Sequence, residues 1–389
     1  MIDQMPAEQR PELEAFIRQR IVDQGGIPFV EYMEHCLYHP QYGYYMAPRE
    51  RIGKKGDFFT STSVHSAFGR LLCRQLEQMW QILAQGSFTI AEQGAGEGHL
   101  CLDILDAAAE EYPEFYRSLQ YRLVDISPDN QQRQKALLQD HLERIEWCSL
   151  AELKGMEGCF LSNELVDAFP VHQVVMQDGQ LQEVYVVAGE EGFVEELRPP
   201  STERLPEHLA GLGVSLVEGA RAEVNLAAVK WMTQLATLVQ RGFILTIDYG
   251  YPAAELYAPW RNRGTLMCYY RHTSNENPYL SPGCQDITAH IDFTTLERVG
   301  ESLGVKRIFY GDQCRFLLGL GFVDLLMEMQ ARTTNENEAR ALRLTLKNLI
   351  MPDGGMGDTF KVLIQAKAVE PPLLLCQRSL SDLPLPPMV

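Results

Sequence analysis

The chain has 389 residues, of which 46% are hydrophobic and 22% charged, and its formal net charge at pH 7 is −18. This length allows one large α/β domain with additions, or two smaller domains. The low charged fraction excludes a disordered polyelectrolyte, and the negative charge argues against a broad nucleic-acid groove as the main binding surface. The sequence has no run of 18 apolar residues, so we expect no membrane-spanning helix.

The chain contains nine cysteines, and no two of them form a CxxC pair. An odd number of loosely spaced cysteines indicates thiols in a reducing compartment and argues against a structural zinc site. The first 16 residues carry both charge signs and lack the apolar core of a secretory signal. We therefore expect a cytoplasmic protein without a bound metal.

The N-terminal part is expected to be helical and then irregular. Helices are predicted over residues 11–24 and 28–37 from the spacing of apolar residues. The following stretch, residues 39–63, is rich in proline, glycine and tyrosine, which is typical of a loop. Residues 1–62 would then form an extension that closes over a binding site.

Beyond this loop, a helix capped by Ser63 or Ser66 is expected to run to about Leu83. From Phe88 onward, short apolar runs alternate with helical segments, which predicts a parallel, doubly wound sheet. The strands are predicted over residues 88–93, 121–126, 145–148 and 159–163, and the helices over residues 100–112 and 128–142.

Residues 171–197 break this alternation with three short β-type runs. The dipeptides Asp178-Gly179 and Glu191-Gly192 are turn signals, so we expect an antiparallel β insertion. Further on, we predict a connector over residues 199–213, a helix over 220–241, a strand over 243–248, and an antiparallel strand pair over 306–310 and 361–368 with helices between.

Together these elements predict a Rossmann-like α/β fold. Its sheet would be mixed and doubly wound, with a helical N-terminal extension and an antiparallel β insertion. The corresponding segments are the extension 1–62, the first half of the sheet 63–170, the insertion 171–219, the second half with helical additions 220–370, and a proline- and leucine-rich tail 371–389.

The most informative residues follow the first predicted strand: Glu92-Gln93-Gly94-Ala95-Gly96-Glu97-Gly98. Glycines at such a turn let a ligand approach the backbone, and the helix that follows offers unpaired N–H groups. The dinucleotide fingerprint GxGxxG would place its third glycine at His99, one residue later. S-adenosylmethionine (SAM) has no pyrophosphate and carries a cationic ammonium and a sulfonium, which suit an acid at Glu92. The pattern ExGxGxG is that of the first motif of class I methyltransferases, although an ordinary strand-to-helix turn would share its glycines.

Asp125 ends the next predicted strand, 33 positions after Glu92. An acid at this place can accept hydrogen bonds from both ribose hydroxyls of a bound nucleoside. Its other interpretation is a turn residue, or the cap of the helix that follows. The candidates for cofactor binding are therefore the residues at the ends of the first, second and fourth strands: Glu92, Gly94, Ala95, Gly96, Gly98, Asp125, Ile126 and Asn163.

Three further acids follow central strands. Glu164 and Asp167 come just after Asn163, and two carboxylates three residues apart can lie on one side of a tight turn. Such a pair suits the donor fork of a guanidinium and could leave one of its nitrogens with more lone-pair character for in-line attack. Asp248 ends another central strand and should line the same crevice. The other interpretation is that these acids only cap helices or end strands.

These residues and their surroundings resemble the MidA-like family of class I SAM-dependent methyltransferases, over residues 27–305. The family includes a mitochondrial protein-arginine methyltransferase of complex I assembly, which is associated with symmetric dimethylation. The resemblance rests on eight strings in one order: PFVEYMEHCLYHPQYGYY, GDFFTS, EQGAGEGHL, NELVDAFPV, EVN, IDYGY, RGTLMCYYRH and DITAHIDF.

The resemblance implies roles for particular residues. The GDFFTS loop implies that Thr60 and Ser61 contact the cofactor, although Thr62 stands where relatives commonly have proline. The strand-two acid falls on Asp125, where relatives often have glutamate. The family's SAM motif falls on Glu92, Gly94, Gly96 and Gly98, and its NE-x-x-DA motif falls on Asn163, Glu164 and Asp167.

We therefore expect a SAM-dependent methyltransferase that acts on a protein arginine, with Glu164, Asp167 and Asp248 as catalytic candidates. Two alternatives stay open: a non-enzymatic assembly or chaperone-like factor that keeps a SAM-binding fold, and a methyltransferase of small molecules. The expected partners are a protein substrate, such as a respiratory-complex subunit, and a second copy of the chain in a homodimer. Neither nucleic acid nor a metal is expected, because methyl transfer from SAM to nitrogen needs no metal.

Overall fold

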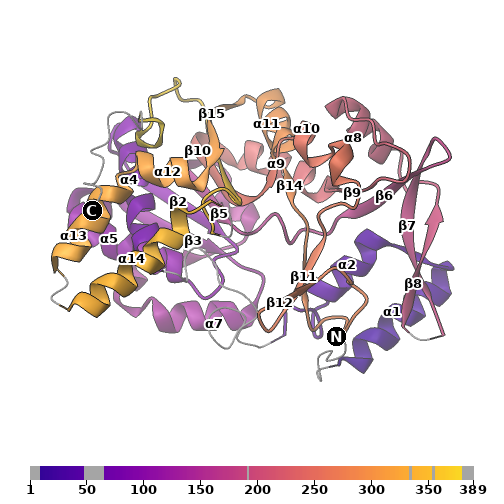
Figure 1. Cartoon of the computed structure of the whole chain (residues 1–389). Helices are drawn as coiled ribbons and strands as arrows, with labels where there is room; N and C mark the ends of the chain where they lie inside the picture. The colour runs from indigo at the N-terminus through magenta and orange to yellow at the C-terminus, as the bar shows by residue number, and fades with distance from the viewer. Residues whose placement is uncertain (1–8, 48–64, 191, 333–334, 353–354, 379–389) are drawn as a thin grey trace. The chain divides into compact units, whose positions relative to one another are not determined.

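The computed structural model describes residues 9–47, 65–190, 192–332, 335–352 and 355–378. The chain forms two compact units, and each is assembled from three separate stretches (Figure 1). The division into five consecutive segments stays a prediction. The first unit comprises Met1–Phe58, Leu165–Met232 and Gly250–Val299, and the second comprises Phe59–Glu164, Thr233–Tyr249 and Gly300–Val389.

One large sheet forms the centre of the second unit. Its strands are β2 (Phe88–Gln93), β3 (Leu119–Val124), β4 (Ile145–Trp147), β5 (Met156–Asn163), β10 (Val239–Tyr251), β15 (Val305–Asp312) and β16 (Phe360–Lys367). They follow the order β15-β16-β10-β5-β2-β3-β4. The strands from β4 to β10 are parallel, whereas β16 is antiparallel to both β10 and β15. This arrangement confirms the predicted mixed, Rossmann-like sheet.

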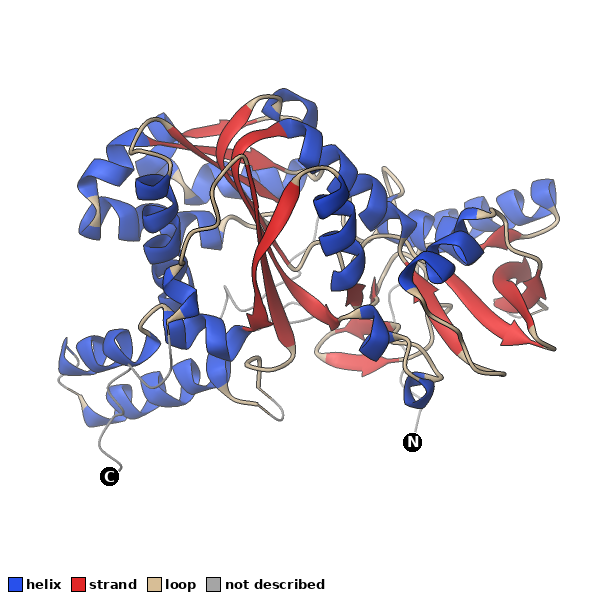
Figure 2. Ribbon diagram, turned by 90° about the horizontal axis from the view of Figure 1, so that it is seen from above, coloured by secondary structure: helices blue, strands red, loops and turns tan. Residues whose placement is uncertain are grey.

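The central strands are buried on both faces, which explains why their sequences are continuous apolar runs rather than alternating ones. One large core cluster joins alternate residues of these strands to apolar side chains of several helices. Figure 2 shows helices packed beside the red strands. The helices that supply this core are α4 (Ala67–Ile82), α5 (His99–Glu111), α6 (Pro113–Ser118), α12 (Gln313–Gly319), α13 (Phe322–Arg332) and α14 (Glu336–Ile350).

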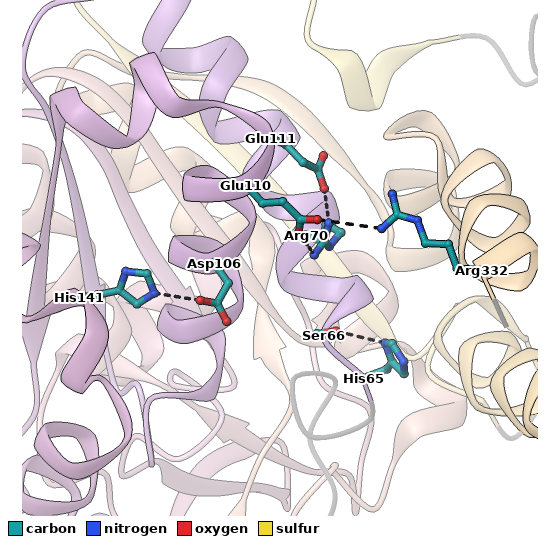
Figure 3. Close-up of polar contacts among 8 residues, drawn as sticks. All are labelled: His65, Ser66, Arg70, Asp106, Glu110, Glu111, His141 and Arg332. Atoms are coloured by element: carbon teal, nitrogen blue, oxygen red, sulfur yellow. Dashed lines mark hydrogen bonds and ion pairs between the residues drawn. The ribbon is translucent and has the colours of Figure 1, made fainter.

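Polar contacts hold α5, the helix that begins directly after the glycine turn. Arg70 of α4 donates hydrogen bonds to Glu110 at 2.6 Å and to Glu111 at 2.5 Å, at the far end of α5 (Figure 3). Asp106, in the middle of α5, pairs with the buried His141 at 2.9 Å. Because α5 is fixed at its middle and at its end, the direction of its first turn is fixed as well.

The first unit contains two antiparallel sheets. The path β1-β7-β6-β9, with β8 paired to β7, forms the larger one, and β12-β11-β13 forms the smaller. The larger sheet contains the predicted antiparallel insertion. The strands are β1 (Ile27–Pro28), β6 (His172–Gln177), β7 (Gln180–Ala188), β8 (Phe193–Arg198), β9 (Arg221–Val224), β11 (Met267–Tyr270), β12 (Thr273–Asn275) and β13 (Asp286–Thr288).

The helical N-terminal extension packs on the insertion within this unit. The helices α1 (Pro11–Gln24) and α2 (Phe29–Tyr38) were both predicted to within about one residue. Leu13, Ile17 and Ile21 of α1 are buried in one core with Val184 and Val186 of β7. The short strand β1 between the two helices pairs with β7, which ties the extension to the insertion.

Two elements differ from the prediction. Residues 199–213, predicted as a connector, contain the helix α8 (Arg204–Leu212). The predicted helix 220–241 is only helical as α9 (Leu226–Leu238): its first residues form β9, and its last residues form the start of β10. Residues 221–224 form a strand because they pair with β6, and this contact between distant segments overrides their local helical pattern.

The remaining elements are short, and no described helix is long and apolar enough to cross a membrane. Asp292 accepts a hydrogen bond from the backbone N–H of Thr294 at 2.9 Å, at the start of the helix α11 (Phe293–Ser302), as expected of a cap. These elements are α7 (Pro128–Leu137), α10 (Ala253–Leu256), α11 (Phe293–Ser302), β14 (Ile291–Asp292), and 3-10 turns at Gln139–Arg144, Leu150–Leu153, Pro259–Arg261 and Leu375–Gln377.

Two glycines lie side by side at the start of the central strands. Gly158 of β5 pairs with Thr89 of β2 on one side and with Gly242 of β10 on the other. Both glycines have φ of 140°, a value that L side chains rarely adopt. A Cβ atom on Gly158 would lie 2.1 Å from the Thr89 carbonyl oxygen, and one on Gly242 would lie 2.0 Å from the Gly158 carbonyl oxygen. The three central strands therefore meet by close backbone approach.

We predict that Gly158→Ala lowers the free energy of unfolding by about 2–4 kcal/mol, because it combines a strained φ with a backbone clash. Urea denaturation followed by circular dichroism measures the change. Gly86→Ala is the matched control, since a Cβ atom there meets nothing within 4 Å. Equal stabilities of the two variants would contradict this account of the central strands.

Candidate cofactor and active site

The glycine turn between β2 and α5 has a left-handed backbone at three positions. Gly94, Gly96 and Gly98 have φ of 76°, 55° and 94°, values that favour glycine. Gly98 is the N-cap of α5, so the first N–H groups of this helix are open to a ligand at the turn. A Cβ atom on Gly98 would lie 3.2 Å from Cγ of Gln134, so this position is also closely packed. Ala95, between the glycines, is half-buried.

Glu92 lies beneath this turn and not on its surface. The side chain is buried, and its Oε2 accepts a hydrogen bond of 2.5 Å from the hydroxyl of Tyr121 on β3. Burial raises the pKa of Glu92 to about 7, the Tyr121 hydroxyl lowers it, and the nearby Asp125 raises it. A cation that approached this carboxyl would favour its ionised form. The contact also fixes Glu92 to the neighbouring strand.

Asp125 follows the end of β3 and is held by its own surroundings. One carboxylate oxygen accepts the backbone N–H of Ser127 at 2.8 Å, and the other accepts hydrogen bonds from Asn130 at 3.3 Å and Gln134 at 3.0 Å. Asp125 therefore forms a turn before α7, and its carboxylate also lies at the strand end, where a ribose could bind. Ile126, the next residue, is 61% exposed.

Gln134 of α7 connects the two cofactor candidates, and the sequence did not single it out. Its side-chain amide nitrogen donates to the carbonyl oxygen of Gly96 at 2.8 Å and to Asp125 at 3.0 Å. Its oxygen accepts a hydrogen bond from the indole of Trp147 at 2.9 Å. Because Gln134 is fully buried, these contacts fix the turn and the acid relative to each other. A single glutamine in a polar helix gives no sequence signal for this role.

Asn163 is the last residue of β5 and carries an unsatisfied acceptor. Its amide nitrogen donates to Glu164 at 3.1 Å, whereas its Oδ1 is buried without a hydrogen-bond partner among the described residues. The hydroxyl oxygen of Ser162, one residue earlier, is in the same state within that part of the chain. Buried polar atoms usually have partners, so an unpaired acceptor at a strand end indicates a place for a ligand donor.

Glu164 has a strained backbone, with φ of 52°. A non-glycine residue in this left-handed region is uncommon and persists only when its surroundings hold it. Its N–H donates to the carbonyl oxygen of Ile247 on β10 at 2.9 Å. Its carboxylate accepts one hydrogen bond from Asn163 at 3.1 Å and one from the hydroxyl of Tyr249 at 2.9 Å. The backbone of Glu164 and both of its carboxylate oxygens are therefore held by contacts to β5 and β10.

The two other predicted acids lie in different places. Asp248 of β10 is fully buried, and its Oδ1 accepts the backbone N–H of Tyr249 at 2.8 Å. Asp167 belongs to the first unit, where its backbone oxygen accepts the N–H of Ala289 at 3.0 Å. Burial raises the pKa of Tyr45 in that unit, and the charges of Asp286 and Asp167 raise it further. The second unit thus gathers Asp248 and Glu164, but not Asp167.

The candidates of the second unit share one edge of its sheet. The strands β3, β2, β5 and β10 are parallel neighbours, so their carboxyl ends meet at that edge. The chain leaves β2 for β3 on one side and reaches β5 on the other, which is the switch point where doubly wound sheets bind ligands. Thr60 and Ser61 lie outside the described residues.

The donors and acceptors at this edge fit SAM. Its ammonium and adenine amine are hydrogen-bond donors, and the buried Oδ1 of Asn163 is an acceptor without a described partner. The ribose hydroxyls need acceptors, which the carboxylate of Asp125 supplies at the next strand end. The glycine turn allows close approach of the ligand to the backbone.

A family model with the description "Putative S-adenosyl-L-methionine-dependent methyltransferase" matches residues 71–310. This match covers more than half of the chain. The chain belongs to this methyltransferase family. The predicted resemblance to MidA-like methyltransferases, the SAM cofactor and the fold class are thereby confirmed.

Relatives with known structures and names agree with this assignment. A COG1565 superfamily protein from Burkholderia thailandensis, bound to S-adenosyl-homocysteine, is 30% identical with a TM-score of 0.85, over 96% of this chain and 97% of that one. The Drosophila melanogaster protein named "Protein arginine methyltransferase NDUFAF7 homolog, mitochondrial" is 28% identical over 74% of this chain and 70% of its own. The Homo sapiens protein named "Protein arginine methyltransferase NDUFAF7, mitochondrial" is 26% identical over 88% of this chain and 80% of its own.

The names of these relatives correct one expectation. The curated relatives are named as mitochondrial proteins, so the prediction of a cytoplasmic methyltransferase is wrong. That prediction rested on the cysteine pattern and on the composition of the first residues. Neither property distinguishes one reducing compartment from another.

We predict that Glu92→Gln makes the methyltransferase more stable at high pH. The folded-state pKa of Glu92 is about 7 and its ordinary value is 4.5, so between these values the folded state keeps a proton that the unfolded state releases. Stability is therefore lost as the pH rises through this window. At pH 8 the variant should be more stable by about 3 kcal/mol, since a tenfold change in proton affinity corresponds to about 1.4 kcal/mol.

Urea denaturation of both proteins without cofactor, at pH 4.5 and at pH 8, measures this difference. The difference should be close to zero at pH 4.5. Asp103, whose pKa burial raises to about 7, is present in both proteins, so the comparison cancels its contribution. A difference that does not change with pH would show that Glu92 is not the titrating group.

Proposed function

We propose that this methyltransferase transfers the methyl group of SAM to a nitrogen of a protein arginine side chain. The observation that carries the proposal is the fixed carboxylate of Glu164, beside the unsatisfied acceptor of Asn163 at the end of β5. The names of the relatives, which are protein arginine methyltransferases, support the same acceptor.

On the cofactor side, the glycine turn and Asp125 would hold the nucleoside, and Asn163 would accept a hydrogen bond from a donor of the cofactor. Glu92 would act from beneath the turn, where its charge responds to a cation. Gln134 would fix the position of the glycine turn relative to Asp125, because it is hydrogen-bonded to both. When bound, SAM supplies a methyl group that its sulfonium already activates.

On the acceptor side, Glu164 would pair with the guanidinium and place one nitrogen in line with the methyl carbon. A carboxylate and a guanidinium form a strong, directional pair, which suits this task. Bound SAM would supply the methyl group, and the proton that the nitrogen loses would pass to the Glu164 carboxylate or to water. The rate gain would come mainly from alignment and from the exclusion of water. Asp248 is buried on the neighbouring strand, and its carboxyl group would lie near the same edge.

The partners are also part of the proposal. We infer a protein acceptor, and a respiratory-complex subunit is the candidate that the resemblance to MidA-like proteins suggests. A second copy of the chain, in a homodimer, is another proposed partner. The catalytic role predicted for Asp167, which is buried near Tyr38 and Tyr45 in the first unit, stays a prediction.

We predict that Glu164→Gln keeps the affinity for SAM within about twofold and lowers methyl transfer at least about 100-fold, the range measured when one fixed charge-stabilising contact is lost. Calorimetry measures binding, and the transfer of labelled methyl from SAM to lysate proteins measures activity. Mass spectrometry of the labelled proteins should find methylated arginine. Glu114→Gln is the matched control, because Glu114 is an exposed surface acid of α6 and should leave both readouts unchanged.

Three results would each contradict a different part of the proposal. Normal turnover of Glu164→Gln would remove Glu164 from the mechanism. Label found only in small molecules would replace the protein acceptor by a metabolite. Wild-type protein that does not bind SAM would favour a non-enzymatic assembly factor.

A further inference from the structure

Tyr249 is the last residue of β10 in the second unit, and its hydroxyl and its ring contact different residues. Its hydroxyl donates to Oε2 of Glu164 at 2.9 Å. Its ring packs on the ring of Phe360 from β16, with 4.3 Å between centroids and an interplanar angle of 36°. The ring contact and the hydroxyl contact can therefore be separated, because phenylalanine keeps the first and loses the second.

The carboxylate that Tyr249 contacts is attached to a strained backbone. Glu164 has φ of 52°, and its N–H extends the β5–β10 ladder by one bond to Ile247. A flexible side chain on such a turn would have several rotamers available. Here Asn163 donates to one carboxylate oxygen and Tyr249 donates to the other.

We propose that Tyr249 is a positioning residue that holds the Glu164 carboxylate in the orientation required to pair with the acceptor. This inference rests on the proposed function of Glu164. Because the two protein donors approach from adjacent strands, they fix both the position and the plane of the carboxylate. Without the hydroxyl of Tyr249, the carboxylate would lose the donor from β10 that contacts Oε2, and it could turn away from the guanidinium.

A purely structural role of the hydroxyl makes different predictions. A hydrogen bond that only supports the fold would change stability and would leave the pH dependence of catalysis unchanged. A donor to the ionised carboxylate favours its charged form, so its removal disfavours that form. A positioning role therefore predicts a shift in the acidic limb of the pH–rate profile, in addition to a slower reaction.

The test is Tyr249→Phe in the full-length protein, with labelled SAM and lysate proteins as acceptors. We expect the rate at saturating SAM to fall about tenfold or more, since misplacement of a reacting group has effects of this order. The KM for SAM and the calorimetric affinity for SAM should stay within about twofold. The acidic limb of the pH–rate profile should move to higher pH.

Two further variants complete the test. Tyr116→Phe is the control, because it loses a hydroxyl contact of 2.8 Å with His141 that lies on α6 and not at the strand ends. It should leave the rate and the pH profile unchanged. In the Glu164→Gln background, Tyr249→Phe should add less than about a twofold loss, because both changes disable the same contact.

The outcomes separate this inference from the one on which it rests. If Glu164→Gln is inactive while Tyr249→Phe keeps the wild-type rate and pH profile, Tyr249 has no positioning role. If both changes lower the rate and their effects multiply, Tyr249 acts independently of Glu164, and the inference is overturned. If Glu164→Gln is fully active, the proposed function of Glu164 fails first.

Discussion

The pairing of β2 with β3 on one side and with β5 on the other is the constraint on which the site depends. It sets the carboxyl ends of three strands side by side and so brings the glycine turn, Asp125 and Asn163 to one edge. The pairing is close because Gly158 lets the backbones of β2 and β5 approach without a side chain between them. Gln134 then ties the two strand ends together above the sheet. The pairing of the backbones therefore sets where the cofactor site lies, and side chains such as Gln134 then hold its parts in place.

Much of this edge could be predicted from the sequence, because the signals are local. The strand β2 was predicted with its observed bounds, because a short apolar run that ends in a glycine cluster is typical of a buried strand before a turn. Asp125 and Asn163 were placed at strand ends by the same reasoning. The alternation with helices predicts a parallel sheet, whose strands all end at the same edge, so the shared edge followed without knowledge of any distance.

The remainder depends on contacts between distant residues. The spacing of Glu164 and Asp167 suggested two acids on one side of a helical turn, but the described segment 164–170 forms no helix, and the two residues belong to different units. The hydroxyl of Tyr249 reaches Glu164 across 85 positions of sequence, and no local pattern predicts this contact. The strand β9 was hidden in a helical pattern because its partner β6 lies about 50 residues earlier.

The place of β16 in the sheet has a consequence for how the chain is made. This strand is the last in sequence among the described strands, yet it is inserted between β10 and β15 and pairs with both. Until it emerges during synthesis, the apolar edge of β10 has no neighbour on that side, and unpaired edges of this kind invite aggregation. The central sheet is thus completed only after Phe360–Lys367 has been synthesised. A nonsense mutation before Phe360 would therefore leave β10 and β15 without the strand that pairs with both, and the exposed edges could pair with other chains.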